Sequence, residues 1–447
     1  MTYTTHFQKT IQLAIPVIVG LLGQMLMGAI DTFMIGKLGH EYVSAAGLGN
    51  SMFYLVAVLG FGLTSVLASL IAESSATDDT KICRDYLQQG VYVGMLVGLV
   101  TVCLLLLCAH YLPLLRQPKM DTMLARGFLE IFGLSAVPML IFLVFKQFTD
   151  GLGNTRAAAI ITLIGLITNI FFNYLLIEGN WGFPRMEVRG TALASFISRI
   201  LMMILMIMYV FQHKPYQKYQ LKENWGKWKG EIAGKIAKLG MLSGLQYWFE
   251  SCAFVGAVIM IGWLGKTEEE SQIYRAAHQI AINLASLTYM VALGISNAGA
   301  IRVGNALGRN DPENLRKAGF TTLFLTLAWM TATATAFVLG RDFFPTLYEI
   351  KHAEVLIVAS RLMVIAAVFQ WFDGAQVAAL GILRGIQDVT VPTIVTFIAY
   401  WVAALPIAYF LGFYCELNID GVWYSFVIGL GVAAVANMTR FWYLTKG

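Results

Sequence analysis

The chain repeats itself once along its length. Met34-Ile35-Gly36-Lys37-Leu38-Gly39 ends one long apolar segment, and Met260-Ile261-Gly262-Trp263-Leu264-Gly265 ends another, 226 residues later. Three further matches follow at spacings of 232, 234 and 231 residues: Gly62-Leu63-Thr64-Ser65 with Gly294-Ile295-Ser296-Asn297, Asp150-Gly151-Leu152-Gly153-Asn154 with Arg384-Gly385-Ile386-Gln387-Asp388, and Arg189-Gly190 with Asp420-Gly421. The spacing drifts little, as expected for a duplicated unit with small loop insertions. Both halves of the chain should therefore fold into the same kind of unit.

Hydrophobic residues make up 58% of the chain and charged residues only 13%, against about 25% charged residues in a typical soluble domain. A soluble protein of this size could not cover its surface with so few charges, so a lipid bilayer must surround most of the chain. Apolar runs of the roughly 20 residues needed for one crossing recur along the whole sequence. We predict twelve spans, at residues 11–35, 46–72, 89–112, 127–149, 157–178, 190–212, 237–264, 276–302, 318–340, 355–382, 391–413 and 421–444.

These spans divide evenly between the two halves, which agrees with the repeat. We therefore predict an all-α membrane protein with an N-terminal six-helix bundle at residues 1–213, a basic linker at 214–236 and a C-terminal six-helix bundle at 237–447. Because six is an even number of crossings, both bundles should enter the membrane from the same side. Their symmetry is then expected to be a pseudo-two-fold about the membrane normal.

Basic residues predict which side of the membrane each connection occupies. Cytoplasmic loops carry an excess of Lys and Arg. The connection after the sixth span is rich in Lys, with Lys214, Lys218, Lys222, Lys227, Lys229, Lys235 and Lys238 in or next to it. The linker and both termini are therefore predicted to be cytoplasmic. The first span is too long for a signal-peptide core, so we expect it to remain in the mature protein.

Charge and cysteine content exclude several kinds of partner. A basic cytoplasmic face explains the net charge of +5, so no nucleic-acid partner is needed. The five cysteines, Cys83, Cys103, Cys108, Cys252 and Cys415, form no Cys-x-x-Cys pair, so structural disulfides and a metal cluster are not expected. We expect no bound cofactor, and we predict that the chain functions as a monomer.

The repeated membrane helices indicate a transport protein. Internal repeats are typical of secondary transporters, which move one half against the other. Channels can also be internally repeated, but a channel would pass its solute downhill without a coupling gradient. A membrane enzyme is a third alternative, although the chain has no His-Glu-x-x-His, Gly-x-Ser-x-Gly or Gly-x-x-x-x-Gly-Lys motif.

Three acidic residues lie within the predicted spans, where a charge costs a few kcal/mol. Glu250 lies about half-way along the seventh span, roughly 16 Å from Leu239 at 1.5 Å per residue. Asp373 lies deep in the tenth span, and Asp31 lies in the outer part of the first. Both Glu250 and Asp373 follow a Trp-Phe pair, and no fixed basic residue is an obvious partner for either.

Such residues suit ion-coupled transport. Burial in apolar surroundings favours the neutral form of a carboxyl group, so it can carry a proton near neutral pH. With other oxygen ligands nearby, Glu250 and Asp373 could instead hold Na⁺, because hard cations prefer oxygen. The alternative is a carboxylate that is hydrogen-bonded for structural reasons or faces a water-filled vestibule.

Several neighbouring residues are candidate contacts for a cation or substrate. Asn169 and Asn173 lie one turn apart on the fifth span, where they either lend oxygens to a cation or join helices by hydrogen bonds. Trp248 and Trp371 stand beside the carboxylates and could bind an organic cation by cation–π attraction. Phe369, four residues before Asp373, and His278, at the start of the eighth span, are the remaining candidates. For these residues, as for the tryptophans, packing is the plainer interpretation.

The chain resembles the multidrug and toxic compound extrusion (MATE) transporters, within them the NorM-like branch. The residues that carry the resemblance are the six-plus-six repeat, Asp31-Thr32-Phe33-Met34-Ile35-Gly36, Glu250, Phe369-Gln370-Trp371-Phe372-Asp373 and Gly381-Ile382-Leu383-Arg384-Gly385-Ile386-Gln387-Asp388. The last stretch is the most specific match, and the resemblance covers nearly the whole chain.

The resemblance implies an antiporter of the bacterial inner membrane that exports cationic or amphipathic compounds in exchange for Na⁺ or H⁺ by alternating access. It places acidic cation-site residues at Asp31, Glu250 and Asp373. The NorM-like pattern often has Tyr four residues before the tenth-span Asp, whereas this chain has Phe369, which removes one hydroxyl from an expected sodium site. A flippase for lipid-linked precursors, within the same superfamily, is the alternative; the midplane carboxylates argue against it.

The topology can be tested by labelling. In a background that lacks the five native cysteines, Lys222→Cys should react with a membrane-impermeant thiol reagent only after the cytoplasmic side is exposed, because the Lys-rich linker lies inside. Labelling from outside intact cells, with none from inside, would reverse the topology.

Overall fold

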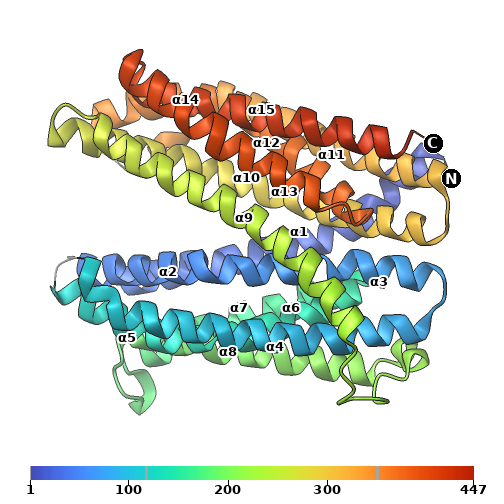
Figure 1. Ribbon diagram of the computed structural model, residues 1–447. Helices are drawn as coiled ribbons and strands as arrows, with labels where there is room; N and C mark the ends of the chain where they lie inside the picture. The colour runs from blue at the N-terminus through green and yellow to red at the C-terminus, as the bar shows by residue number, and fades with distance from the viewer. Residues whose placement is uncertain (1, 116–118, 349–351, 447) are drawn as a thin grey trace. The chain divides into compact units, whose positions relative to one another are not determined.

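A computed structural model of the protein describes residues 2–115, 119–348 and 352–446. The regular structure of these residues is helical throughout (Figure 1). Twelve helical stretches in the described ranges are long and apolar enough to cross a membrane. The predicted all-α fold with twelve spans is therefore confirmed.

The described residues of the first half form six spans from eight α-helices. The second and fourth spans are each built from two helices, which meet at Val66 and at Ser135. The bounds are α1 (Tyr3–Gly36), α2 (His40–Ser65), α3 (Leu67–Ala76), α4 (Thr80–Tyr111), α5 (Lys119–Leu134), α6 (Ala136–Gly151), α7 (Arg156–Leu176) and α8 (Val188–Gln212), with short 3-10 turns η1 (Leu112–Leu115), η2 (Asn180–Gly182) and η3 (Lys214–Tyr219).

The described residues of the second half also form six spans, of which the eleventh in the chain is irregular. The bounds are α9 (Gly230–Leu264), α10 (Glu268–Gly308), α11 (Pro312–Leu339), η4 (Phe344–Tyr348), α12 (Ala353–Gly385), α13 (Thr390–Phe397), η5 (Ile398–Ala404), α14 (Leu405–Tyr409), η6 (Phe410–Tyr414) and α15 (Asn418–Leu444). Segments η5 and η6 are π-helical, and Pro406 lies two residues after the end of η5. Proline removes a helical hydrogen bond, and π-helical turns often accompany functional sites.

The chain divides into two compact units whose borders lie inside helices. Unit 2 comprises Val19–Gly244, and unit 1 comprises Met1–Ile18 with Leu245–Gly447. The start of α1 thus packs with the second half of the chain, where Ala14 joins Ile295 and Ala298 in one apolar cluster. The predicted bundles instead meet at the 214–236 linker.

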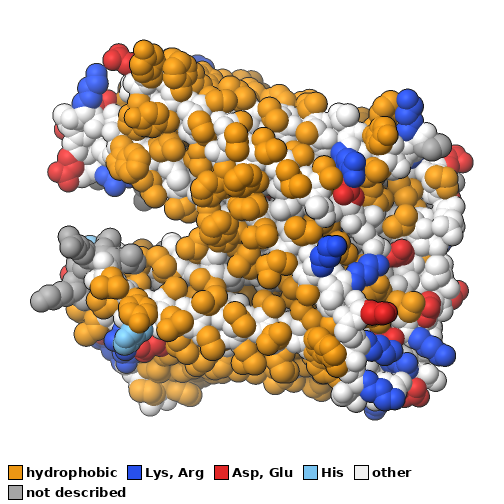
Figure 2. Space-filling model, viewed as in Figure 1, with side chains coloured by type: hydrophobic (Ala, Val, Ile, Leu, Met, Phe, Trp, Pro, Cys, Tyr) orange, Lys and Arg blue, Asp and Glu red, His pale blue; other side chains and the backbone are white. Residues whose placement is uncertain are grey.

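Each unit has its own apolar core. In unit 2, α7 packs on α8, α4 on α6 and α2 on α5, and one large cluster of buried side chains joins them. In unit 1, α10 packs on both α11 and α12, and α12 on α15. Figure 2 shows hydrophobic side chains over the middle of the viewed face of unit 2, with Lys and Arg gathered near α3 and the loop before α9. This distribution fits a bilayer around the middle of the helices.

The repeat extends to the helix caps. Asp79 accepts a hydrogen bond from the backbone N–H of Ile82 at the start of α4 (3.0 Å). Asp311, 232 residues later, accepts one from Asn314 at the start of α11 (3.0 Å). A side-chain acceptor satisfies one of the free N–H groups at a helix N-terminus, so both halves begin their third span in the same way.

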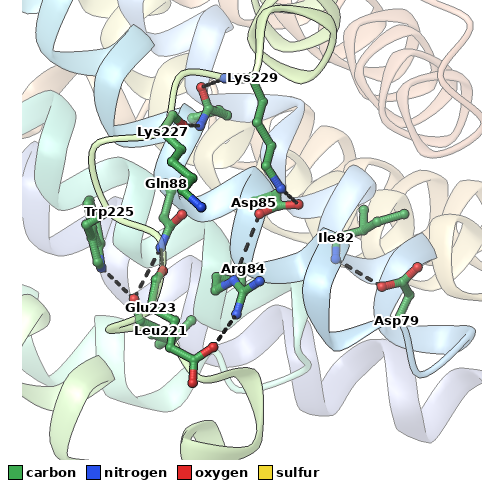
Figure 3. A network of polar contacts seen from close by, with 11 residues as sticks. Asp79, Ile82, Arg84, Asp85, Gln88, Leu221, Glu223, Trp225, Lys227 and Lys229 are labelled. Atoms are coloured by element: carbon green, nitrogen blue, oxygen red, sulfur yellow. Dashed lines mark hydrogen bonds and ion pairs between the residues drawn. The ribbon is translucent and has the colours of Figure 1, made fainter.

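The basic linker is bound to α4 (Figure 3). Gln88 donates to the backbone carbonyls of Glu223 (2.6 Å) and Leu221 (3.3 Å). Gln89 donates to the carbonyl of Lys227 (2.9 Å). Because Gln88 and Gln89 are almost fully buried, these bonds hold the linker backbone firmly on unit 2.

Ion pairs reinforce this attachment. Lys229 lies 2.5 Å from Asp85, and Arg84 lies 3.3 Å from Glu223 (Figure 3). Asp85 and Arg84 are both about 95% buried, so removing either Lys229 or Glu223 would leave a buried charge with fewer partners. The linker is therefore a structured part of unit 2.

Close helix contact in unit 2 depends on Gly62 of α2. A Cβ at this position would lie 2.1 Å from the Cα of Gly244 in α9, whereas a Cβ at Gly47 of α2 would meet nothing within 4 Å. We expect Gly62→Ala to destabilise the protein by about 1–3 kcal/mol, as overpacked cores do. Gly47→Ala is the matched control on the same helix.

Thermal unfolding of the two purified variants in detergent measures the difference. The melting temperature should fall for Gly62→Ala and stay level or rise slightly for Gly47→Ala. Equal melting temperatures would contradict the close contact of α2 with α9.

Candidate cation sites

Asp31 lies at the centre of a polar cluster inside unit 2. Its Oδ1 accepts a hydrogen bond from Asn173 Nδ2 of α7 (2.6 Å), and its Oδ2 accepts one from Ser195 Oγ of α8 (2.9 Å). Asn169 completes the cluster, since its Oδ1 accepts from Asn173 (3.1 Å) and its Nδ2 donates to Ser195 (3.1 Å). Asp31 is 8% exposed, and the other three side chains are at most 2% exposed. Three helices thus place these four residues in one buried site.

The Asp31 cluster can hold a hard cation. Both carboxylate oxygens accept hydrogen bonds, which suits the ionised form of Asp31. The Oδ1 atom of Asn173 is buried and has no hydrogen-bond partner. A buried acceptor without a partner is costly, and a cation beside the carboxylate would satisfy it. Carboxylate, amide and hydroxyl oxygens are the ligands that hard cations prefer.

Arg199 lies one turn after Ser195 on α8 and interacts electrostatically with Asp31. Its guanidinium does not form an ion pair with that carboxylate; it donates to Ser135 Oγ (2.5 Å). The group also lies over the rings of Phe53 (4.8 Å) and Phe132 (4.4 Å). These contacts hold the positive charge close to the Asp31 site without occupying it.

Glu250 lies on α9 in unit 1, beside a tyrosine of the π-helical segment η5. The hydroxyl of Tyr400 is 3.4 Å from Glu250 Oε1 and 3.2 Å from Gln376 Oε1 of α12. A tyrosine hydroxyl has one proton, so Tyr400 donates either to Glu250 or to Gln376. Tyr400 is fully buried, whereas Glu250 is partly exposed. Loading of Glu250 with a cation or proton would therefore free the tyrosine proton for Gln376.

Asp373 is the second carboxylate of unit 1. It lies on α12, one turn before Gln376, and it is 6% exposed. Asp373 interacts electrostatically with Glu250, so the two carboxylates repel each other when both are ionised. Tyr289 of α10 interacts electrostatically with both. A cation or proton that reduces this repulsion would bind favourably.

The three predicted acidic residues share one property. Within the described ranges, none of Asp31, Glu250 and Asp373 forms an ion pair with a basic side chain; the ion pairs present are formed by other carboxylates. Asp31 is separated by the unit border from Glu250 and Asp373, so each unit holds its own acidic site. In the described residues, no group of three His, Cys, Asp or Glu side chains could hold a metal ion.

The other predicted contact residues lie in different surroundings. His278 is 5% exposed and packs edge-on against Trp423 (5.6 Å between ring centroids), which also packs against Phe369 (5.4 Å). Trp371 is 40% exposed, and its indole N–H donates to Thr331 Oγ1 (3.2 Å). Trp248 stacks on Trp401 with nearly parallel rings (6.5 Å, 7°). None of these contacts joins His278 or either predicted tryptophan to Glu250 or Asp373.

Three residues of these sites were not predicted from the sequence. Ser195 belongs to the run of small hydroxyl residues in α8 with Thr191 and Ser198, a pattern that ordinary helix packing also produces. Gln376 and Tyr400 are polar residues in otherwise apolar spans. Isolated polar residues in apolar spans could have marked these positions as candidate site residues. Which helices they join depends on the fold.

Comparison with known proteins supports the resemblance to the MATE transporters independently of the geometry. The sequence profile of the MatE family matches residues 16–175 and 244–410 of this chain. The chain is 30% identical to the "Probable multidrug resistance protein NorM" of Rhizobium meliloti (strain 1021), over 100% of this chain and 95% of that protein. It is also 30% identical to the "Multidrug resistance protein MdtK" of Yersinia enterocolitica serotype O:8 / biotype 1B, over 99% of this chain and 97% of that protein.

The fold is also similar to that of solved structures. One, described as the "outward-facing conformation of a multidrug resistance MATE family transporter of the MOP superfamily", superposes with a TM-score of 0.89. The alignment covers 99% of this chain and 97% of that chain at 20% sequence identity. At this identity the likeness shows that the fold is shared.

Proposed function

The chain belongs to the MATE family, and from this premise we propose that it is an antiporter that exports cationic or amphipathic organic compounds in exchange for Na⁺ or H⁺. The observation that carries the proposal is the pair of carboxylates Glu250 and Asp373. They lie close enough to interact electrostatically, in the middle of spans of unit 1 and without a basic partner in an ion pair. Such costly groups mark ion and substrate pathways in membrane proteins.

Coupling follows from the electrostatics of the two carboxylates. A proton or Na⁺ on either group removes negative charge, and so weakens the attraction for a cationic compound at the same place. By linkage, the compound weakens binding of the ion to the same extent. Entry of the ion down its gradient can thus expel the compound.

The Asp31 cluster of unit 2 is a second proposed ion site. Asp31, Asn169, Asn173 and Ser195 offer oxygen ligands in a buried cage, and Asn173 Oδ1 has no other partner. These residues would hold Na⁺ directly, or Asp31 would carry a proton. Phe369 lacks the hydroxyl that the NorM-like pattern often has at this position. The hydroxyl of Tyr400, which reaches Glu250 from another helix, would take its place.

The proposed substrate class rests on charge and on relatives. Acidic groups within the spans attract organic cations, and aromatic side chains such as the stacked Trp248 and Trp401 offer flat apolar surfaces. Relatives of nearly full-length similarity are named multidrug resistance proteins. A flippase for lipid-linked precursors is not favoured, since a phosphate-bearing lipid would require basic groups where these carboxylates lie.

The location of the protein in the cell follows from its apolar helices, its relatives and its Lys-rich linker. Twelve apolar helices make it a multi-pass membrane protein, and its bacterial relatives favour the inner membrane. The Lys-rich linker supports cytoplasmic termini. We further propose that one chain is sufficient for transport, because the acidic sites of each unit are built within that unit.

We expect Glu250→Gln and Asp373→Asn each to abolish coupled dye export, because each removes one of the two charges that the ion and the dye share. Efflux from vesicles with a fixed amount of reconstituted protein measures the effect. Glu268→Gln, at the exposed start of α10, is the matched control and should keep wild-type efflux. Wild-type export by both carboxylate variants would falsify the proposed role of the pair.

We also expect the coupling ion to weaken equilibrium binding of ethidium to the purified protein. Lowering the pH protonates the carboxylates, and raising Na⁺ neutralises them, so either change should raise the dissociation constant; reciprocal couplings of this kind are typically about 5–150-fold. Glu250→Gln and Asp373→Asn should blunt the effect. Dye affinity that is indifferent to both ions would rule out competition at these carboxylates.

A further inference from the structure

Arg384 of α12 is a buried cation that the proposed mechanism leaves unexplained. Its side chain is 4% exposed. The guanidinium donates from Nη2 to the hydroxyl of Tyr247 (2.9 Å) and lies over the tyrosine ring (5.3 Å). Among the residues that the structure describes, no carboxylate forms an ion pair with it. A buried charge without a directly paired counter-charge is costly and needs a reason.

The repeat shows that this charge is specific to the second half. The residue 234 positions earlier is Asp150, which pairs with Lys146 at 2.7 Å while both side chains are buried. The residue 234 positions after Lys146 is Leu380. The neutral Lys–Asp pair of unit 2 is therefore replaced in unit 1 by a leucine and a single arginine, which adds one positive charge.

Arg384 reaches the surroundings of the two carboxylates. Its partner Tyr247 lies three residues before Glu250 on α9, and residues at this spacing share a helix face. The charges of Glu250, Asp373 and Arg384 all act on Tyr289 of α10, the carboxylates and the guanidinium in opposite directions. One tyrosine thus lies within electrostatic range of both the acidic pair and the guanidinium.

Close packing holds α12 in place around Arg384. A Cβ at Gly381 would lie 2.1 Å from Ser296 Oγ, and one at Gly385 would lie 2.8 Å from the carbonyl oxygen of Ala300. These two glycines, on either side of Arg384, bring α12 into direct contact with α10. The backbone that carries the guanidinium is therefore fixed relative to Tyr289.

We propose that Arg384 sets the charge selectivity of the Glu250–Asp373 site, so that this site is neutralised by one monovalent organic cation. This inference rests on the proposed function and names its substrate class. Two ionised carboxylates and one guanidinium leave one net negative charge. A monocation cancels that charge, whereas a dication leaves an excess positive charge where the dielectric constant is low.

Removal of the guanidinium should shift this preference. Arg384→Gln leaves two negative charges near the site, which favours a dication over a monocation. Arg384 follows Asp373 by eleven residues on α12, roughly 16 Å at 1.5 Å per residue. At that separation and an effective dielectric constant near 20, one unit charge changes binding of another by about fivefold. The ratio of dication to monocation affinity should therefore rise by about that factor.

Ethidium and propidium test this charge effect, because both carry the same ring system but one and two positive charges, respectively. Equilibrium binding of each dye to the purified full chain gives the affinity ratio. We expect the wild-type protein and Arg384→Lys to prefer ethidium, and Arg384→Gln to shift towards propidium. An unchanged ratio in folded Arg384→Gln would overturn the proposal.

Two further variants separate charge from structure. Tyr247→Phe removes the hydrogen bond but keeps the guanidinium, so its ratio should stay near wild type; a shift equal to that of Arg384→Gln would assign the effect to local structure and overturn the proposal. Arg361→Gln, on the same helix but paired with Asp420 (2.9 Å), removes a distant cation and should also leave the ratio unchanged.

A double variant keeps the test valid if Arg384→Gln does not fold. Arg384→Gln with Asp373→Asn again has one net negative charge, so it should bind ethidium more tightly than Asp373→Asn alone. An equal or weaker affinity would overturn the proposal.

Ion-driven ethidium efflux by the wild-type protein in vesicles is measured in parallel. Loss of that efflux would count against the proposed function, whereas intact efflux with an unshifted ratio would count against the role of Arg384 alone.

Discussion

The cost of placing a carboxylate within a membrane span governs how both units are built. Each acidic residue must find hydrogen-bond donors, a cation or a proton, because lipid supplies none of them. In unit 2, Asn173 and Ser195 reach Asp31 from two other helices. In unit 1, Tyr400 reaches Glu250 from the π-helical segment η5. The distortion of the eleventh span lies at the residue that supports the acidic site.

The duplicated halves share their helices but differ in their sites. The caps at Asp79 and Asp311 and the paired spans retain the common plan. The acidic chemistry has diverged: unit 2 surrounds one carboxylate with amide and hydroxyl oxygens, whereas unit 1 brings two carboxylates near each other. The exchange of the Lys146–Asp150 pair for Leu380 and Arg384 is a second divergence. The two proposed ion sites would therefore bind their ions with different affinities.

The sequence was sufficient for features that depend on composition along one segment. Span number follows from apolar run length, and Asp31, Glu250 and Asp373 stand out because charges are rare in spans. Contacts between segments were not predictable in the same way. Ser195 looks like an ordinary packing residue until α7 and α8 place it beside Asp31. Trp371 lies two residues before Asp373 in sequence. Its indole N–H nevertheless donates to Thr331 of α11, because neighbouring residues on a helix point in different directions. The linker reads as a basic loop, and only the buried Gln88 and Gln89 show that α4 holds it.

Ethidium efflux from vesicles that contain the purified protein, with a Na⁺ gradient and a pH gradient imposed separately, tests the central claim most directly. We expect at least one inward ion gradient to drive the dye out against its own gradient, and we expect this transport to stop when the ion gradient is dissipated. Dye movement that runs only downhill and is the same with either gradient or with neither would contradict coupling through the acidic residues.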